Sequence, residues 1–338
     1  MIDLESIAED ILNQTAKGIR IEVIARGWKA SVPYLGSPHF FITRDDGKKL
    51  HIFSATPLTT SYAAAHLAND KFATYNLLKE INIPQLDTVM VSDSAGMDEA
   101  IAFMHIYKKV VVKPIDGGHG NGISLNITNA VELEQAIKIA MEHTKSKRAV
   151  LVQKEYDYPT IFDLRILCIN YTHAASIRRV AARVFGDGVH TIRELIEQEN
   201  VTSRRGEPYR AELATISIDR AERYLKERIN DVPIGGTEAQ VLGIANYGAG
   251  GETVDVTDDI PDWLIDYAQD IARTCELPVA GVDFMLSKLP TKESTKEELN
   301  PAFTEVNKSP LLAMHDNPTK GIGRGVVKKY MDYLASLD

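Results

Sequence analysis

Apolar and polar residues along this chain alternate with two periods, one typical of β-strands and one typical of α-helices. Near the N-terminus the pattern predicts a helix and then three strands, over about 3–16 and near 19–25, 39–43 and 50–54. Apolar residues at helical spacing predict a longer helix over 59–80, and Pro84 marks its end. Helices and strands mixed in this way indicate an α/β or α+β protein with mixed sheets.

The segment from Val110 to Ile127 carries the strongest local signal in the chain. A loop rich in glycine joins a β-branched run to an alternating run, and its glycines are Gly117, Gly118, Gly120 and Gly122. Glycines at this density let backbone N–H groups turn toward one point, which suits phosphate oxygens. A P-loop or Rossmann loop leads into a helix, whereas this loop leads into a strand. We therefore predict a β-hairpin tip whose Lys113 reaches the same phosphates; a plain surface hairpin is the alternative.

Downstream of this hairpin the pattern returns to a helix and two strands. Asn129 and Glu132 form an N-cap and third-position pair for a helix that ends near residue 143. Strands are predicted over 150–154 and 164–169. Two charged stretches are predicted to be a solvated loop and a surface hairpin tip, over 200–212 and 287–298 respectively.

Three oxygen-bearing side chains occur on two predicted strands near the C-terminus. Asp283 lies in the apolar run 281–285, and Glu305 and Asn307 lie two residues apart in 304–307. Residues two apart on a strand point to the same face, so a hairpin would bring the three side chains together. Such oxygens suit Mg²⁺, and residues that hold it would matter more for turnover than for folding. The simpler interpretation is an exposed acidic strand face.

Basic residues gather between the glycine loop and these acidic residues, at Arg165, Arg178, Arg179 and Arg183. In an acidic chain such a cluster favours contact with phosphate or carboxylate groups. Considered singly, each arginine is more simply interpreted as a surface charge than as a ligand. Lys71 is predicted to lie on a helix, where a single lysine is usually solvated. No Ser-His-Asp arrangement and no zinc-ligand spacing can be argued.

Composition excludes several classes of protein. The 338 residues allow two or three packed lobes, and a formal net charge of −9 argues against a long nucleic-acid groove. The two cysteines, Cys168 and Cys275, show neither a CxxC spacing nor a disulfide framework, which predicts a cytoplasmic protein. The N-terminus is acidic and no long apolar run occurs, so neither a signal peptide nor a membrane span is predicted.

Several short motifs occur in the order that is found in one known family. They are Leu58-Thr59-Thr60-Ser61, Asn69-Asp70-Lys71, Val112-Lys113-Pro114 with the glycine loop, Asp163-Leu164-Arg165, Arg178-Arg179, Gly186-Asp187-Gly188, Arg204-Arg205-Gly206, Gly281-Val282-Asp283, Glu305-Val306-Asn307 and Met314-His315. By these motifs the chain resembles the ATP-grasp ligases, most closely the ATP-grasp parts of cyanophycin synthetases and of bifunctional glutathione synthetases. The resemblance runs from about Leu58 to Arg324.

The resemblance implies an α+β, ATP-grasp fold in which a nucleotide is held between two α+β subdomains. It implies a short N-terminal domain, a subdomain with the glycine-rich lid and a subdomain with the metal site, over 1–57, 58–152 and 153–338. It assigns ATP contacts to Lys71, Lys113, Gly117, Gly118, His119, Gly120, Gly122, Gln153, Lys154, Glu155, Tyr156 and Asp163. It assigns Mg²⁺ to Asp283, Glu305 and Asn307, and the reacting groups to Arg165, Arg179 and Asn246.

The implied function is ATP-dependent carboxylate–amine ligation on an amino acid or short peptide. In the family's scheme the substrate carboxylate attacks the γ-phosphate to give an acylphosphate, and an amine then displaces phosphate. The implied partners are small molecules, without nucleic acid or membrane, and the oligomeric state is open, a homo-oligomer included. Two alternatives stay open: a nucleotide-binding module that regulates or scaffolds a partner, and a kinase-like phosphotransferase.

Departures from the family pattern fall where the amino-acid substrates are expected to bind. Leu242 stands where the relatives usually carry an arginine, Tyr247-Gly248-Ala249 replaces Leu-Ser-Thr, and Leu311 replaces a glycine. A leucine cannot make the bidentate contact that arginine makes with a carboxylate. We therefore expect a less acidic or differently placed substrate than those of the two relatives; the alternative is that a nearby arginine, such as Arg183, compensates.

Overall fold

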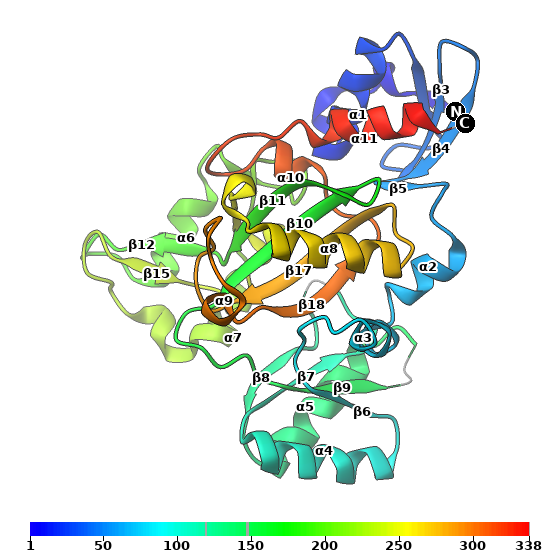
Figure 1. Cartoon of the computed structure of the whole chain (residues 1–338). Helices are drawn as coiled ribbons and strands as arrows, with labels where there is room; N and C mark the ends of the chain where they lie inside the picture. Colours follow the sequence, from blue (N-terminus) through cyan, green and yellow to red (C-terminus); the bar gives the residue numbers. More distant parts are fainter. Residues whose placement is uncertain (119, 147–148, 338) are drawn as a thin grey trace.

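The computed structural model describes residues 1–118, 120–146 and 149–337 (Figure 1). Within these residues the chain forms three larger sheets, each accompanied by helices. The strand pairs of all three sheets are antiparallel, so the prediction of mixed sheets is wrong for them. The separation of helices and antiparallel sheets agrees with the predicted α+β class.

The first sheet belongs to the N-terminal part of the chain and has the order β1-β2-β3-β4-β5. Its strands are β1 (Ile2–Asp3), β2 (Lys29–Val32), β3 (His39–Thr43), β4 (Lys49–Phe53) and β5 (Thr56–Pro57). The strands predicted near 39–43 and 50–54 are thereby confirmed. Their buried and exposed residues alternate, so that one face of this sheet enters the core.

The helix and the first strand predicted within residues 3–25 are wrong. Two short 3₁₀ turns come first, and one helix, α1 (Gln14–Ala25), then fills the region. Ile19, Ile21 and Val23 alternate as in a strand, yet Ile19 and Val23 are buried while Ile21 is 63% exposed. The buried pair is four residues apart, which is the spacing of one helix face.

The second sheet has the order β6-β9-β7-β8 and carries the glycine loop. Its elements are α2 (Tyr62–Leu67), α3 (Lys71–Lys79), β6 (Thr88–Val91), α4 (Ser94–Tyr107), β7 (Val110–Pro114), β8 (Ser124–Ile127), α5 (Ala130–His143) and β9 (Val150–Lys154). The β7–β8 hairpin, the helix after Asn129 and the strand at 150–154 are confirmed. The helix predicted over 59–80 is broken in two, because the side chain of Asp70 caps a new helix by accepting from the N–H groups of Phe72 and Ala73.

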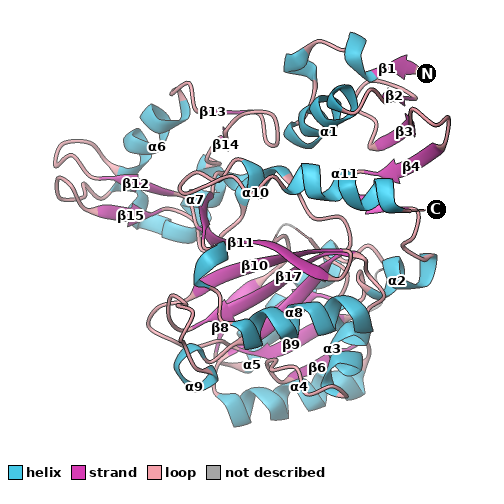
Figure 2. Cartoon of the chain, turned by 45° about the horizontal axis from the view of Figure 1, so that its top comes forward, coloured by secondary structure: helices cyan, strands magenta, loops and turns pink. Residues whose placement is uncertain are grey.

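The third sheet has the order β16-β11-β10-β17-β18. Its strands are β10 (Phe162–Ile169), β11 (Thr172–Val180), β16 (Glu252–Asp255), β17 (Val279–Leu286) and β18 (Ala302–Asn307), and α8 (Asp262–Thr274) lies across β10 and β17 (Figure 2). Alternate residues such as Leu164, Ile166 and Val282 pack against α8. The residues between them face the other way, where the candidate site lies.

Smaller elements lie beside β11. They are β12 (Arg183–Phe185), α6 (Ile192–Asn200), β13 (Arg205–Gly206), β14 (Leu213–Ala214), α7 (Ile218–Leu225), β15 (Glu238–Gln240) and 3₁₀ turns at Lys226–Asn230, Tyr247–Ala249 and Thr257–Asp259. The prediction that the stretch 200–212 is a solvated loop is wrong at Arg205. The guanidinium of Arg205 is buried and donates to the carbonyl oxygens of Ala214 (2.8 Å) and Gly250 (2.9 Å).

The C-terminal helix α11 (Val326–Ser336) joins the first sheet to the third. Short helices α9 (Lys296–Leu299) and α10 (Ala313–Asp316) precede it. One hydrophobic cluster contains Ile19 of α1, Ile42 of β3, Leu167 of β10 and Tyr330 of α11, and the two termini lie close together (Figure 1). In the described part of the chain no helix is long and apolar enough to cross a membrane.

Candidate functional site

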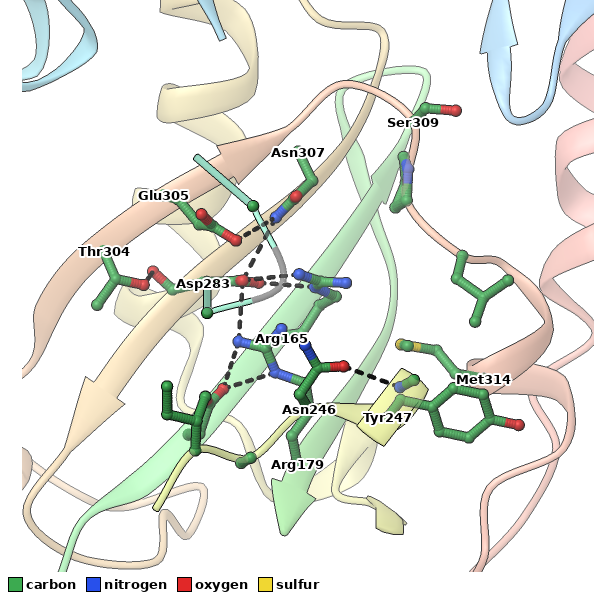
Figure 3. Close-up of a pocket in the computed structure, with 18 of the residues that line it drawn as sticks. Arg165, Arg179, Asn246, Tyr247, Asp283, Thr304, Glu305, Asn307, Ser309 and Met314 are labelled. Atoms are coloured by element: carbon green, nitrogen blue, oxygen red, sulfur yellow. Dashed lines mark hydrogen bonds and ion pairs between the residues drawn. The ribbon is translucent and has the colours of Figure 1, made fainter. Parts of the chain in front are cut away.

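A row of charged residues crosses the free face of the third sheet. Asp283 on β17 lies directly opposite Arg165 on one neighbouring strand and Glu305 on the other. Direct cross-strand neighbours point to the same face of a sheet, so the three side chains stand together. The side-chain Nδ2 of Asn307 lies 3.3 Å from Asp283 Oδ2 and 3.4 Å from Glu305 Oε1 (Figure 3). The structure therefore brings together the three residues that the sequence grouped.

Two arginines hold the carboxylate of Asp283. The Nε and Nη2 of Arg165 donate to its two oxygens, each at 2.7 Å, and Arg179 Nη2 donates to Oδ2 at 2.9 Å. Arg179 also donates through Nε to Asp163 at 2.7 Å. Burial would raise the pKa of Asp283, but the two guanidinium groups outweigh it and hold that pKa below its usual value. Burial raises the pKa of Asp163 to about 6, although Arg179 opposes the rise.

The residues around Asp283 fit a magnesium ion. Two carboxylates and one amide meet there, and Mg²⁺ prefers such oxygen ligands. No group of three or more His, Cys, Asp or Glu side chains forms a metal site in the described ranges, so the third ligand here would be the amide. The nitrogen of Asn307 faces the carboxylates, and a half-turn of the amide would present its oxygen instead.

Two lysines approach this cluster from the second sheet. Lys71 opens α3, and its Nζ donates to the carbonyl of Gly117 at 2.5 Å and lies 3.7 Å from Glu305 Oε2. The Nζ of Lys113 on β7 donates to Gln153 Oε1 at 2.9 Å. Burial, with the nearby charge of Lys71, lowers the pKa of Lys113 to about 8. A phosphate at this point would restore the full charge of Lys113.

The glycine loop leans from the β7–β8 hairpin toward the third sheet. Gly117, Gly118 and Gly120 line the central cavity. Gly120 has φ +73°, which favours glycine, and a Cβ there would lie 2.8 Å from Ile244 Cδ1, so Ile244 would have to shift. Gly122 packs against Pro114 and α5 instead of the cavity. His119, also assigned to the nucleotide, lies outside the described residues.

The end of β9 and the residues that follow it lie along the same cavity. Gln153, Lys154, Glu155 and Tyr156 all line it. The backbone N–H groups of Lys154 and Glu155 already donate, to the carbonyls of Asp87 (2.9 Å) and Lys109 (3.3 Å). The hydroxyl of Tyr156 donates to Asn300 O at 2.7 Å and thereby ties this segment to the third sheet.

One cavity of about 1220 Å³ connects all these groups. Asn246 lines it, and its Oδ1 accepts the N–H of Gly248 at 2.8 Å, so this side chain also shapes its own loop. Tyr209 and Arg210 line it as well, although the sequence pattern predicted a solvated loop over these residues. Leu4 from the N-terminal part also reaches the cavity. No local pattern marks these residues, because only the packing of distant segments brings them there.

Leu242, expected to mark a lost carboxylate contact, is buried in a hydrophobic cluster with Val184 and Leu195. It does not itself line the described cavity, and the loss of a carboxylate contact at this position stays a prediction. Arg183 is engaged elsewhere, in ion pairs with Glu238 and Glu252. Of the sequence departures, Tyr247 and Leu311 do line the cavity.

Several known proteins are similar to this chain in sequence. A family model described as "Prokaryotic glutathione synthetase, ATP-grasp domain" matches residues 78–201. Cyanophycin synthetase of Trichormus variabilis is 32% identical over 333 residues, which cover 96% of this chain and 36% of that protein. The bifunctional glutathione biosynthesis protein GshAB of Clostridium perfringens is 27% identical, over 87% of this chain and 38% of that protein. The chain thus spans little more than a third of the length of these relatives.

A solved structure supports the same fold. The crystal structure of a bifunctional glutathione synthetase from Pasteurella multocida superposes with a TM-score of 0.68 at 21% identity. The match covers 97% of this chain and 44% of that one.

Proposed function

Because the chain is an ATP-grasp protein by sequence and by fold, we propose that it is an ATP-dependent ligase joining a carboxylate to an amine. The substrates are an amino acid or short peptide on each side of the new bond. An oxygen of the substrate carboxylate attacks the γ-phosphorus and ADP leaves. The amine then attacks the acyl carbon, phosphate leaves and the amine loses a proton.

The nucleotide lies between the glycine loop and the third sheet in this proposal. Lys71 and Lys113 neutralise phosphate charge, and the loop from Gly117 covers the phosphates. Asp283, Glu305 and Asn307 hold Mg²⁺, which supplies charge stabilisation at the transferred phosphoryl group when it is bound. Arg165 and Arg179 orient Asp283 and present their remaining N–H groups to the reacting carboxylate. Catalysis of this kind rests on positioning and needs no protein nucleophile.

One observation carries the proposal: two lysines, two arginines and a set of three oxygen ligands converge on a single cavity from two sheets. A structural ion-pair network has no need of two lysines from another part of the chain, one of which, Lys113, is half-buried and has a lowered pKa. The same convergence favours an active enzyme over a nucleotide-binding module without catalysis.

The test is ADP release, with a panel of amino acids and short peptides offered singly and in pairs, and with mass analysis of the products. A ligase releases ADP at full rate only when a carboxylate and an amine are both present, and the product has lost one water relative to the pair. A kinase-like enzyme would release ADP with one substrate and yield a phosphorylated product.

A matched pair of variants ties the turnover to the site. Glu305→Gln should abolish Mg²⁺-dependent turnover, whereas Glu297→Gln, on the exposed helix α9, should leave it unchanged. Equal activity of the two variants would remove Glu305 from the mechanism. Binding of Mg-ATP without ADP release from any pair would favour the regulatory module.

A further inference from the structure

The charged row on the third sheet ends in an apolar patch. Ile177 on β11 lies directly opposite Arg165 on β10, on the side away from Asp283. Ile177 belongs to a small hydrophobic cluster with Tyr247, Met314, Tyr209 and Leu311, which we name the Tyr247 cluster. Its members come from four segments that are distant in the sequence. The pairing of β10 with β11 therefore places the cluster next to the proposed reaction centre.

Four members of the Tyr247 cluster line the cavity: Tyr209, Tyr247, Leu311 and Met314. Figure 3 shows Tyr247 and Met314 on the other side of Arg165 from Glu305. The hydroxyl of Tyr247 donates to Glu212 O at 2.9 Å, so its polar end is satisfied within the protein and its ring is left to the cluster. The rings of Tyr209 and Tyr247 have centroids 6.4 Å apart.

The loop backbone makes room for this arrangement. A Cβ on Gly248 would lie 2.6 Å from the hydroxyl oxygen of Tyr209, so a larger residue there would push Tyr209 away. Leu311 and Tyr209 are half-buried, whereas Tyr247 and Met314 are buried. The cluster thus has a closed floor and a partly open rim toward the cavity.

The cations near this patch already have polar partners, including Arg220, which lies near Tyr209 and donates to Asn121 Oδ1 at 3.2 Å. Arg165 and Arg179 bind Asp283, and Arg210 pairs with Glu207 at 2.7 Å. Lys308 donates to the carbonyl of Ala65 at 3.0 Å. In the proposed mechanism the remaining N–H groups of Arg165 and Arg179 bind the reacting carboxylate. An acidic substrate side chain on the cluster would therefore have to compete with these partners or remain unpaired, and burial of an unpaired charge is unfavourable.

Arg178 lines the same cavity and has no carboxylate within ion-pair distance in the described residues, but its side chain points away from the cluster. It lies between Ile177 and Arg179 on β11, and successive residues of a strand face opposite ways. Its guanidinium lies over the ring of Phe162, 4.5 Å from the centroid. Arg178 therefore offers no charge to a side chain lying on the cluster.

We propose that the Tyr247 cluster is a side-chain pocket of the ligase and selects a substrate amino acid with an uncharged, apolar side chain of the size of leucine, methionine or phenylalanine. This inference rests on the proposed ligase function and names its substrate class. The pocket sets specificity, while the reacting carboxylate or amine lies beside Arg165 and Asn246. Aliphatic and aromatic side chains around a pocket favour the burial of apolar substrate surface and disfavour the burial of a charge.

Calorimetric binding to the full chain with Mg²⁺ and a non-hydrolysable ATP analogue tests the pocket directly. The ligands are free leucine, methionine, phenylalanine, aspartate, lysine and glycine, each of which carries both reacting groups. At least one of the three apolar ligands should bind about tenfold or more tightly than aspartate, lysine and glycine. Equal or tighter binding of aspartate or lysine, or no binding of any apolar ligand, would overturn the inference.

Two variants locate the binding. Leu311→Arg should weaken leucine binding about tenfold or more and improve aspartate binding, because it adds an unpaired cation at the rim. The matched control is Leu289→Arg, at an exposed leucine outside the cavity lining, which should change neither. If circular dichroism finds Leu311→Arg unfolded, Tyr209→Gln takes its place, with the same expected loss for the apolar ligands. Unchanged leucine binding in the folded variant would refute the pocket.

ADP release under the same conditions separates the two proposals. Apolar ligands that bind as expected, without ADP release for any pair of substrates, would defeat the ligase assignment and leave the pocket standing. ADP release that is fastest with aspartate or lysine would overturn the pocket and leave the ligase standing.

Discussion

Replacing Asp283 by asparagine should destabilise the protein far more than replacing Glu305 by glutamine, although each change removes one charge from the same cluster. The side chain of Asp283 is 1% exposed and accepts three charge-assisted hydrogen bonds from two arginines. The side chain of Glu305 is 35% exposed, and its nearest lysine nitrogen is 3.7 Å away. The sequence predicted that the candidate metal residues matter more for turnover than for folding. From their burial we now expect this of Glu305, and we expect Asp283 to matter for folding as well.

The magnitudes follow from burial. Removing one partner of a buried ion pair costs about 3–5 kcal/mol, because the remaining guanidinium keeps its desolvation penalty. An exposed pair contributes about 0–1 kcal/mol. A folded protein has about 5–15 kcal/mol of stability in total, so Asp283→Asn should lose a large part of it. With an m-value of about 3 kcal/mol/M, the urea midpoint should fall by about 1–2 M.

Urea unfolding followed by circular dichroism measures both variants against the parent chain. We expect Asp283→Asn to shift the midpoint by that amount and Glu305→Gln to shift it by less than about 0.3 M. ADP release should be lost in both. Equal midpoints for the two variants would refute the argument that Arg165 and Arg179 depend on Asp283 for their burial.

Three further predictions concern the lysine, the lid and the subdomain core. The pKa of Lys113 is about 8 in the folded protein, against 10.5 when unperturbed. Between these two pH values the unfolded chain binds a proton at Lys113 that the native state lacks. The contribution of Lys113 to the free energy of unfolding therefore grows as pH rises through this range. ATP binding near pH 9 should therefore take up a proton, and Lys113→Gln should remove that uptake in calorimetry with two buffers of different ionisation enthalpy. Gly120→Ala should raise the KM for ATP, and Mg-ATP should slow hydrogen exchange at 120–122 in the parent but not in the variant. Leu242→Arg buries a charge and should lower the urea midpoint by about 1 M or more; a stable variant that gains aspartate binding would contradict this.

Local sequence patterns were enough to predict the strands that carry the candidate metal residues and the convergence of their side chains. Asp283, Glu305 and Asn307 lie on the neighbouring antiparallel strands β17 and β18, so period-two alternation and the pairing of these two strands suffice to place their side chains together. The glycine loop was equally readable, because the β-branched and alternating runs on either side of it define a hairpin.

Only the tertiary structure decided which way the remaining residues face. Ile19, Ile21 and Val23 suit a strand or a helix, and contact with the C-terminal helix favours the helix. The sequence suggested that position 242 belongs to the substrate site, yet the side chain of Leu242 packs beside Val184 in a buried hydrophobic cluster. Such choices depend on contacts between segments far apart in the chain, and local periodicity carries no information about those contacts.

The residues of the pocket beside Arg165 were likewise brought together only by the tertiary structure. Tyr247 and Leu311 were recognised in the sequence as departures from a family pattern, but nothing in the sequence related one to the other or to Tyr209. They meet because β11, the 3₁₀ turn after Asn246 and the segment before α10 close over one point of the sheet. The sequence thus determined the sheet and the chemistry carried by its strands, whereas long-range closure of loops determined what surrounds that chemistry.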